Sequence, residues 1–196
     1  MVSFPFCGHK AGMELLRHQT KIAFLIGLHL TVYGLFWVVL SPVYLGWQAV
    51  ILAGLLIWVS VWDFRTFEIP DTASALLLIT GLVFTFGAGD LLQAALSAVL
   101  WAGVFLAIAV GFSTLRGVDG LGLGDVKLMA GIGAWLGPFA PVYVVLSAAL
   151  SAIVTLLVVA VMRENKSPIS TKTGIAFGPF LCLSAWAVWI SSGGIK

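Results

Sequence analysis

The sequence is poor in charged residues and in cysteine. Only 9% of its 196 residues are charged, whereas 61% are hydrophobic and the mean hydropathy is +1.11. A typical soluble domain has about 25% charged residues. This composition therefore excludes an ordinary soluble domain and indicates a membrane protein. The two cysteines, Cys7 and Cys182, form no paired CxxC framework, so neither a disulfide scaffold nor a zinc site is supported.

Motifs of several other protein classes are missing as well. No GxSxG, HExxH or Walker pattern occurs, so serine-hydrolase, zinc-protease and nucleotide chemistries lack support. The net charge is +2 without a basic run, which argues against a nucleic-acid partner. The three histidines, His9, His18 and His29, have no metal-ligand spacing. We therefore expect no metal and no cofactor.

Apolar segments bounded by charges, prolines and glycines predict the architecture. A helix needs roughly 20 apolar residues to cross a bilayer core of about 30 Å. We expect an all-α, polytopic membrane helix bundle of about seven spans, or six if the short segment 125–136 is re-entrant. Residues 1–21 would form a cytoplasmic tail and residues 22–191 the membrane domain. The expected spans are 22–40, 47–62, 72–87, 91–112, 125–136, 142–162 and 174–191.

Basic residues orient the predicted spans. Lys and Arg in short loops collect on the cytoplasmic side of a membrane. If the N-terminus is cytoplasmic and all segments cross, the loops 63–71, 113–124 and 163–173 are cytoplasmic. All ten basic residues except Lys196 then fall on or beside that side. This distribution supports a crossing by the short segment 125–136.

Acidic residues gather at two of these cytoplasmic edges. Asp63 ends the second segment, in WDFRTFEIPD, and Asp125 begins the fifth, in GLGLGDVK. Ionisable residues beside hydrocarbon are costly to keep and are functional candidates by default. Two carboxyls that share a site do not both ionise easily, so one keeps a proton while the other draws a proton from water. Such a pair is suited to hydrolysing an amide without a metal, provided that the two spans pack together.

Structural interpretations of the same residues compete with this one. Glu68 and Asp71 fit a solvated loop in which Asp71 caps the next helix, and Asp125 alone fits a helix cap. The glycines of GLGLGDVK allow a sharp bend and the close approach of an extended peptide. Helix dipoles favour Asp125, at a helix N-terminus, as the anion, and disfavour ionisation of Asp63 at a helix C-terminus.

Three patches together resemble one protein family. They are Asp63 followed by Ile-Pro, the GxGD-x-K pattern at 122–127, and AFGPFL at 176–181. The pattern resembles the type IV prepilin and preflagellin leader peptidases, which are GxGD aspartic proteases of the membrane. The resemblance implies that Asp63 and Asp125 form the catalytic pair.

The resemblance also implies a substrate and a location. Gly122, Gly124 and Lys127 would bind the substrate, which would be a pilin-like precursor of the Flp or archaellin type. Its short leader would be removed on the cytoplasmic side of a prokaryotic inner membrane. Asp71 stands where the family commonly has Asn. The chain has no room for the Cys-rich region linked to N-methylation, so we expect no methyl transfer.

Two alternatives remain open at this point. Presenilin-type proteases also use GxGD, but they pair it with Tyr-Asp, whereas Trp62 precedes Asp63 here. A small proton-coupled transporter or a pilus-assembly membrane protein is the competing class. Transporters use interrupted helices and buried carboxylates, but their sites usually lie near the bilayer midplane. The sequence leaves open the precursor, the oligomeric state and the roles of Glu68 and Asp71.

Overall fold

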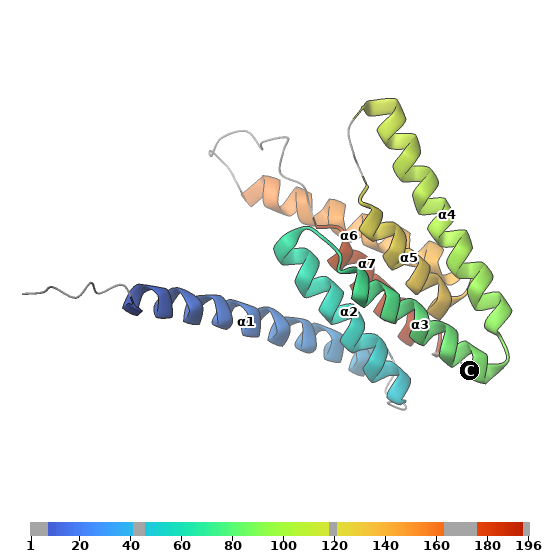
Figure 1. Cartoon of the computed structure of the whole chain (residues 1–196), viewed down its shortest axis with the longest axis horizontal. Coiled ribbons are helices and arrows are strands. Elements are labelled where there is room, and N and C mark those ends of the chain that lie inside the picture. Colours follow the sequence, from blue (N-terminus) through green and yellow to red (C-terminus); the bar gives the residue numbers. More distant parts are fainter. Residues whose placement is uncertain (1–7, 41–45, 118–120, 163–175, 194–196) are drawn as a thin grey trace, which may run out of the picture.

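A computed structural model describes residues 8–40, 46–117, 121–162 and 176–193, and its regular structure there is entirely α-helical. Figure 1 shows the helices as a bundle from which the N-terminal part of α1 extends. The prediction of an all-α helix bundle is confirmed. The helices are α1 (Gly8–Leu40), α2 (Trp47–Thr66), α3 (Asp71–Ala88), α4 (Leu91–Arg116), α5 (Leu123–Leu136), α6 (Ala140–Met162) and α7 (Gly178–Ser191).

Every helix except α1 begins and ends within about four residues of its predicted segment. Helix α1 begins at Gly8, well before the predicted span start at residue 22. No proline interrupts residues 8–40, so the helix continues through the charged stretch. The charged residues of this stretch indicate where the chain was expected to enter the membrane, but they do not end the helix. Residues 1–7 of the predicted tail and the predicted cytoplasmic loop 163–173 lie outside the described residues.

Four described helices, α2, α3, α4 and α6, are long and apolar enough to cross a membrane. Two shorter apolar helices lie at Ala23–Val39 and Gly178–Ser191. Helix α5 has 14 residues, which corresponds to about 21 Å at the usual rise per residue. Large apolar side chains on α4 and α6 are exposed, for example Leu92 and Leu146, as expected for surfaces that face lipid. The chain is an integral membrane protein.

Helix α5 packs closely against α3 and α4 because small residues line the contact. A Cβ added at Gly131 would lie 2.9 Å from Leu77 of α3, and one at Gly133 would lie 2.8 Å from the backbone oxygen of Ser97 of α4. Small residues allow helix backbones to approach in membranes. The Trp135 indole N–H also donates a 2.9 Å hydrogen bond to the Leu77 backbone carbonyl. These contacts fix α5 within the bundle.

Helix α7 contacts four other helices, which are α1, α2, α5 and α6. The Trp186 indole N–H donates a 3.0 Å hydrogen bond to the Tyr33 carbonyl of α1. His29 of α1 lies 2.8 Å from the Ser60 hydroxyl of α2, so His29 is a packed histidine with a polar partner. The helices that contact α7 thus include α2 and α5, which hold the predicted aspartates.

Candidate functional site

The predicted aspartates lie near helix ends at one edge of the bundle. The C-terminal end of α2 and the N-terminal ends of α3 and α5 point to the same side (Figure 1). Asp63 lies in the last turns of α2, and Asp125 lies in the first turn of α5. Arg65 lies in the last turn of α2 and Lys127 near the start of α5, and Arg116 is the last residue of α4.

Asp63 is buried, with only 5% of its surface exposed. Its backbone carbonyl accepts a 2.9 Å hydrogen bond from the Phe67 N–H. Phe67 adopts a left-handed conformation with φ of 56°, which ends α2 and begins the short connection to α3. The Asp63 carboxylate accepts a 3.0 Å hydrogen bond from the backbone N–H of Gly178.

Asp125 lies outside the four helices that are long enough to span a membrane. Burial, followed by the negative charge of Asp63, raises the pKa of Asp125 to about 6, and a hydrogen bond from the Gly122 backbone acts in the opposite direction. The two carboxyls are therefore close enough to interact electrostatically. A carboxyl with a pKa near 6 exchanges a proton close to neutral pH.

Helix α7 contacts both aspartate-bearing helices, α2 and α5, and α3 does so as well. Helix α5 packs chiefly against α3 and α4. The thiol of Cys182, in the second turn of α7, lies within electrostatic range of both Asp63 and Asp125. Helices α3 and α7 therefore both link the two aspartate-bearing helices.

Sequence reasoning missed the contact of Gly178 with Asp63. The AFGPFL patch supported the family resemblance, but no site role was predicted for its glycine. The available signal was a glycine directly before Pro179 at the start of a helix, where Pro commonly occupies the first turn. This signal places the helix start, but it does not identify the carboxylate that the glycine contacts.

The sequence suggested Asp71 and Asp125 as helix caps, but neither is the N-cap residue of its helix. Pro70 is the N-cap of α3 and Gly122 is the N-cap of α5, and neither helix has a side-chain cap hydrogen bond. Asp71 instead forms a 2.6 Å ion pair with Lys127. Asp125 is the third residue of α5, so it lies inside the first turn and not at the cap.

The other predicted site residues surround Asp125. Gly122 has an extended backbone with φ of −71°, and a Cβ there would make only ordinary contact with the Asp125 carboxylate at 3.7 Å. At Gly124 a Cβ would lie 3.0 Å from the Cβ of Ile69. Gly124 therefore lets α5 approach the connection between α2 and α3. Gly120 of the GLGLGDVK stretch lies outside the described residues.

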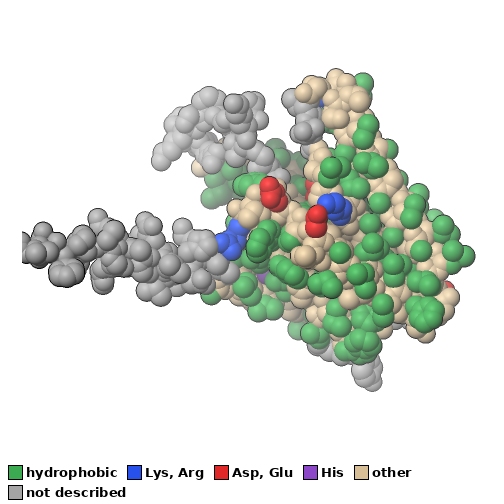
Figure 2. All heavy atoms as spheres, viewed as in Figure 1, with side chains coloured by type: hydrophobic (Ala, Val, Ile, Leu, Met, Phe, Trp, Pro, Cys, Tyr) green, Lys and Arg blue, Asp and Glu red, His purple; other side chains and the backbone are tan. Residues whose placement is uncertain are grey.

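On the face seen in Figure 2, most of the charged side chains gather in one region of the bundle, and hydrophobic side chains are spread over the rest of the described surface. Glu68 and Asp71 are exposed, as are both members of the Asp71–Lys127 pair. Glu68 donates its backbone N–H to the Thr66 hydroxyl at 3.3 Å. The edge near the aspartates is thus polar, as expected where the bundle leaves the hydrocarbon.

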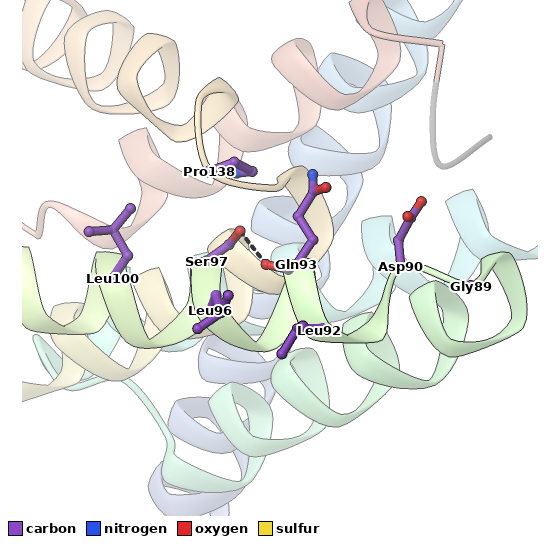
Figure 3. Close-up of a pocket in the computed structure, with 8 residues that line it drawn as sticks. All are labelled: Gly89, Asp90, Leu92, Gln93, Leu96, Ser97, Leu100 and Pro138. Carbon is purple, nitrogen blue, oxygen red and sulfur yellow. Dashed lines mark hydrogen bonds between the residues drawn. The ribbon is translucent and has the colours of Figure 1, made fainter.

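A separate pocket of about 500 Å³ lies where the α3–α4 connection meets the residues after α5 (Figure 3). Leu92, Leu96 and Leu100 supply its apolar wall, and Asp90 and Gln93 supply polar groups. The pocket contains neither Asp63 nor Asp125: it lies beyond the C-terminal ends of α3 and α5, whereas Asp125 lies at the N-terminal end of α5 and Asp63 lies in α2. Among the described residues, no group of three or more His, Cys, Asp or Glu side chains is arranged to hold a metal ion.

The fold and the site define a helical integral membrane protein with two interacting carboxyls at one edge. A family model described as the type IV leader peptidase family matches residues 50–161. This range includes both aspartates and helices α3–α5. The chain belongs to this family.

Curated relatives agree with the family match. The prepilin leader peptidase/N-methyltransferase of Neisseria gonorrhoeae is 33% identical over 87% of this chain and 55% of the relative. The protein of the same name from Escherichia coli K12 is 37% identical over 67% of this chain and 60% of the relative. Leader peptidase HopD of Escherichia coli is 36% identical over 65% of this chain and 82% of the relative. The chain thus spans little more than half the length of the first two. No solved structure shows significant similarity to it.

Proposed function

We propose that the chain is a membrane-embedded aspartic endopeptidase that removes the leader of type IV pilin-like precursors. Asp63 and Asp125 are its catalytic pair. The observation that supports this proposal best is the placement of two carboxyls near helix ends at one edge of a membrane helix bundle, where burial, together with the charge of Asp63, raises the pKa of Asp125. The names of the relatives, prepilin leader peptidase and leader peptidase, agree with it.

The proposed chemistry needs one proton shared by the pair. Because the pKa of Asp125 is raised to about 6, we assign the shared proton to Asp125, in contrast to the helix-dipole expectation. Ionised Asp63 draws a proton from a water molecule, whose oxygen attacks the scissile carbonyl carbon. Asp125 protonates the carbonyl oxygen. Collapse of the tetrahedral intermediate breaks the C–N bond: Asp63 gives the proton that it took from water to the leaving nitrogen, and Asp125 takes a proton back from a hydroxyl of the intermediate.

The active site faces the cytoplasm in this proposal. Arg65, Arg116 and Lys127 belong to helix ends at the edge that holds the aspartates. The described connections at the opposite edge, Gly89–Asp90 and Gly137–Phe139, contain no Lys or Arg. By the positive-inside rule, the aspartate edge is cytoplasmic.

A cleavage assay tests the proposed function. Purified protein in detergent is incubated with a panel of pilin-like precursors, and the products are identified by mass spectrometry. We expect release of the leader at one peptide bond. The transporter alternative makes a different prediction for protein reconstituted in vesicles: no precursor is cut, and the Asp63→Asn variant loses a proton-coupled solute flux. That pair of results would refute the peptidase.

Gly122, Gly124 and Lys127 are proposed to lie on the substrate side of the site. Gly122 is exposed, and its backbone is proposed to contact the peptide. Gly124 packs against Ile69 and Lys127 pairs with Asp71, so these two also have structural contacts. The part that each plays in substrate binding therefore has to be separated from its part in stability.

The effects of Lys127 on stability and on substrate binding can be measured separately. The side chains of Lys127 and Asp71 are 51% and 74% exposed, so solvent screens their attraction. A double-mutant cycle of Lys127→Ala and Asp71→Ala, measured by unfolding in detergent, should give a coupling energy of no more than about 1 kcal/mol. A larger KM for the precursor in Lys127→Ala, but not in Asp71→Ala, would indicate direct substrate contact. Equal KM values in both variants would contradict the proposed binding role.

A further inference from the structure

The first turn of α7 contacts the Asp63 carboxylate directly. The Gly178 N–H donates to Asp63 Oδ2 at 3.0 Å, between residues 115 positions apart in the sequence. Pro179 follows and has no N–H, and the Phe180 N–H bonds to the Phe177 carbonyl at 3.1 Å. In this turn, the Gly178 N–H is thus the backbone donor that bonds to Asp63.

Gly178 leaves no room for a side chain. A Cβ at this position would lie 2.6 Å from Asp63 Oδ2 and 3.1 Å from its Cγ. Gly178 does not have a positive φ, unlike Gly89, Gly117, Gly137 and Gly193. Space beside the carboxylate, and not an unusual backbone conformation, therefore requires glycine here.

The contact also has an electrostatic consequence. A free N–H at a helix N-terminus is a favourable partner for an anion, because the partial positive charge of the helix end adds to the hydrogen bond. Asp63 thus lies at the C-terminal end of α2 and also at the N-terminal end of α7. The second contact offsets the unfavourable dipole of the first. Among the described residues, Asp125 and Cys182 are titratable groups that interact electrostatically with Asp63.

We propose that Gly178 is a positioning residue for catalysis, whose backbone N–H and missing side chain hold the Asp63 carboxylate in its active orientation and ionised. This inference rests on the proposed function, because it assigns Asp63 the part of the base. It makes the start of α7 a component of the active site. The FGPF segment then has a physical role in this chain, through its glycine.

Gly178→Ala tests the proposal in the precursor cleavage assay. The methyl group would displace the Asp63 carboxylate, and hydrogen bonds to charged groups are among the stronger ones in proteins. We expect kcat to fall at least 10-fold with KM little changed, and the acid limb of the pH–rate profile to move to higher pH because ionised Asp63 has lost a donor. Gly54→Ala in α2, where a Cβ meets nothing within 4 Å, is the matched control and should behave as the wild type.

A backbone ester at position 178 provides a second test, which can be used if Gly178→Ala does not fold. Glycolic acid introduced there by nonsense suppression removes the N–H and adds no side chain. We expect an approximately 10- to 100-fold lower kcat and the same shift of the acid limb. A folded Gly178→Ala or ester protein with the wild-type kcat and pH profile would overturn the inference. Asp63→Asn distinguishes the two proposals: if it cleaves normally, the proposed function itself has failed.

Discussion

Asp63→Asn and Asp125→Asn should each reduce precursor cleavage by about 10²- to 10⁴-fold, the range that positioned acid and base groups contribute to catalysis. Asn has nearly the same shape as Asp but can neither accept a proton as a base nor supply one as a carboxylic acid. The two losses should not add in the double variant, since neither carboxyl acts without the other. Initial rates at saturating precursor measure the effect.

Asp90→Asn is the matched control for these variants. Asp90 is an exposed aspartate at the N-terminal end of α4 without a side-chain cap hydrogen bond, and it belongs to the pocket at the other edge of the bundle. We expect its cleavage rate to equal that of the wild type. A folded Asp63→Asn or Asp125→Asn protein that retains full activity would show that the carboxyl in question is not catalytic.

Gly133→Ala should have the largest effect on stability among the glycine substitutions at this helix contact. Its Cβ would lie 2.8 Å from the backbone oxygen of Ser97 and 3.1 Å from its backbone carbon. A backbone cannot rotate away as a side chain does, so α4 and α5 must separate. Overpacking of this kind costs about 1–3 kcal/mol. Cleavage should fall as well, because α5 holds Asp125.

Unfolding in detergent, followed by tryptophan fluorescence, measures the destabilisation. Gly103→Ala in α4 is the control, because a Cβ there meets nothing within 4 Å. If Gly133→Ala is as stable as Gly103→Ala, the close approach of α4 and α5 is not present in the protein.

The helices were largely predictable from the sequence. Long apolar segments ended by Gly, Pro or charged residues mark helix ends well, because these residues either break helices or remain at the membrane surface. Pro70 and Gly122 illustrate this, since they cap α3 and α5 close to the predicted starts. The start of α1 was not predictable in this way. The polar stretch after Gly8 leaves the apolar pattern but contains no proline to stop a helix.

The candidate site was predictable only in part. Topology placed Asp63 and Asp125 at one edge, because spans of opposite direction end and begin on the same side. The packing of α7 against both aspartate-bearing helices depends on how helices distant in sequence meet, and no local pattern encodes it. The Gly178 contact with Asp63 and the ion pair of Lys127 with Asp71 are missed for the same reason.

The most direct test of the account is whether Asp63 and Asp125 titrate as one pair. Infrared spectroscopy of carboxyl bands in aspartate-labelled protein measures this, and the band absent from Asp125→Asn identifies Asp125. We expect Asp125 to be protonated below about pH 6 and ionised above it, because its pKa is raised to about 6. In Asp63→Asn the neighbouring charge is gone, so the pKa of Asp125 should fall. An Asp125 titration that is the same with and without Asp63 would contradict the account.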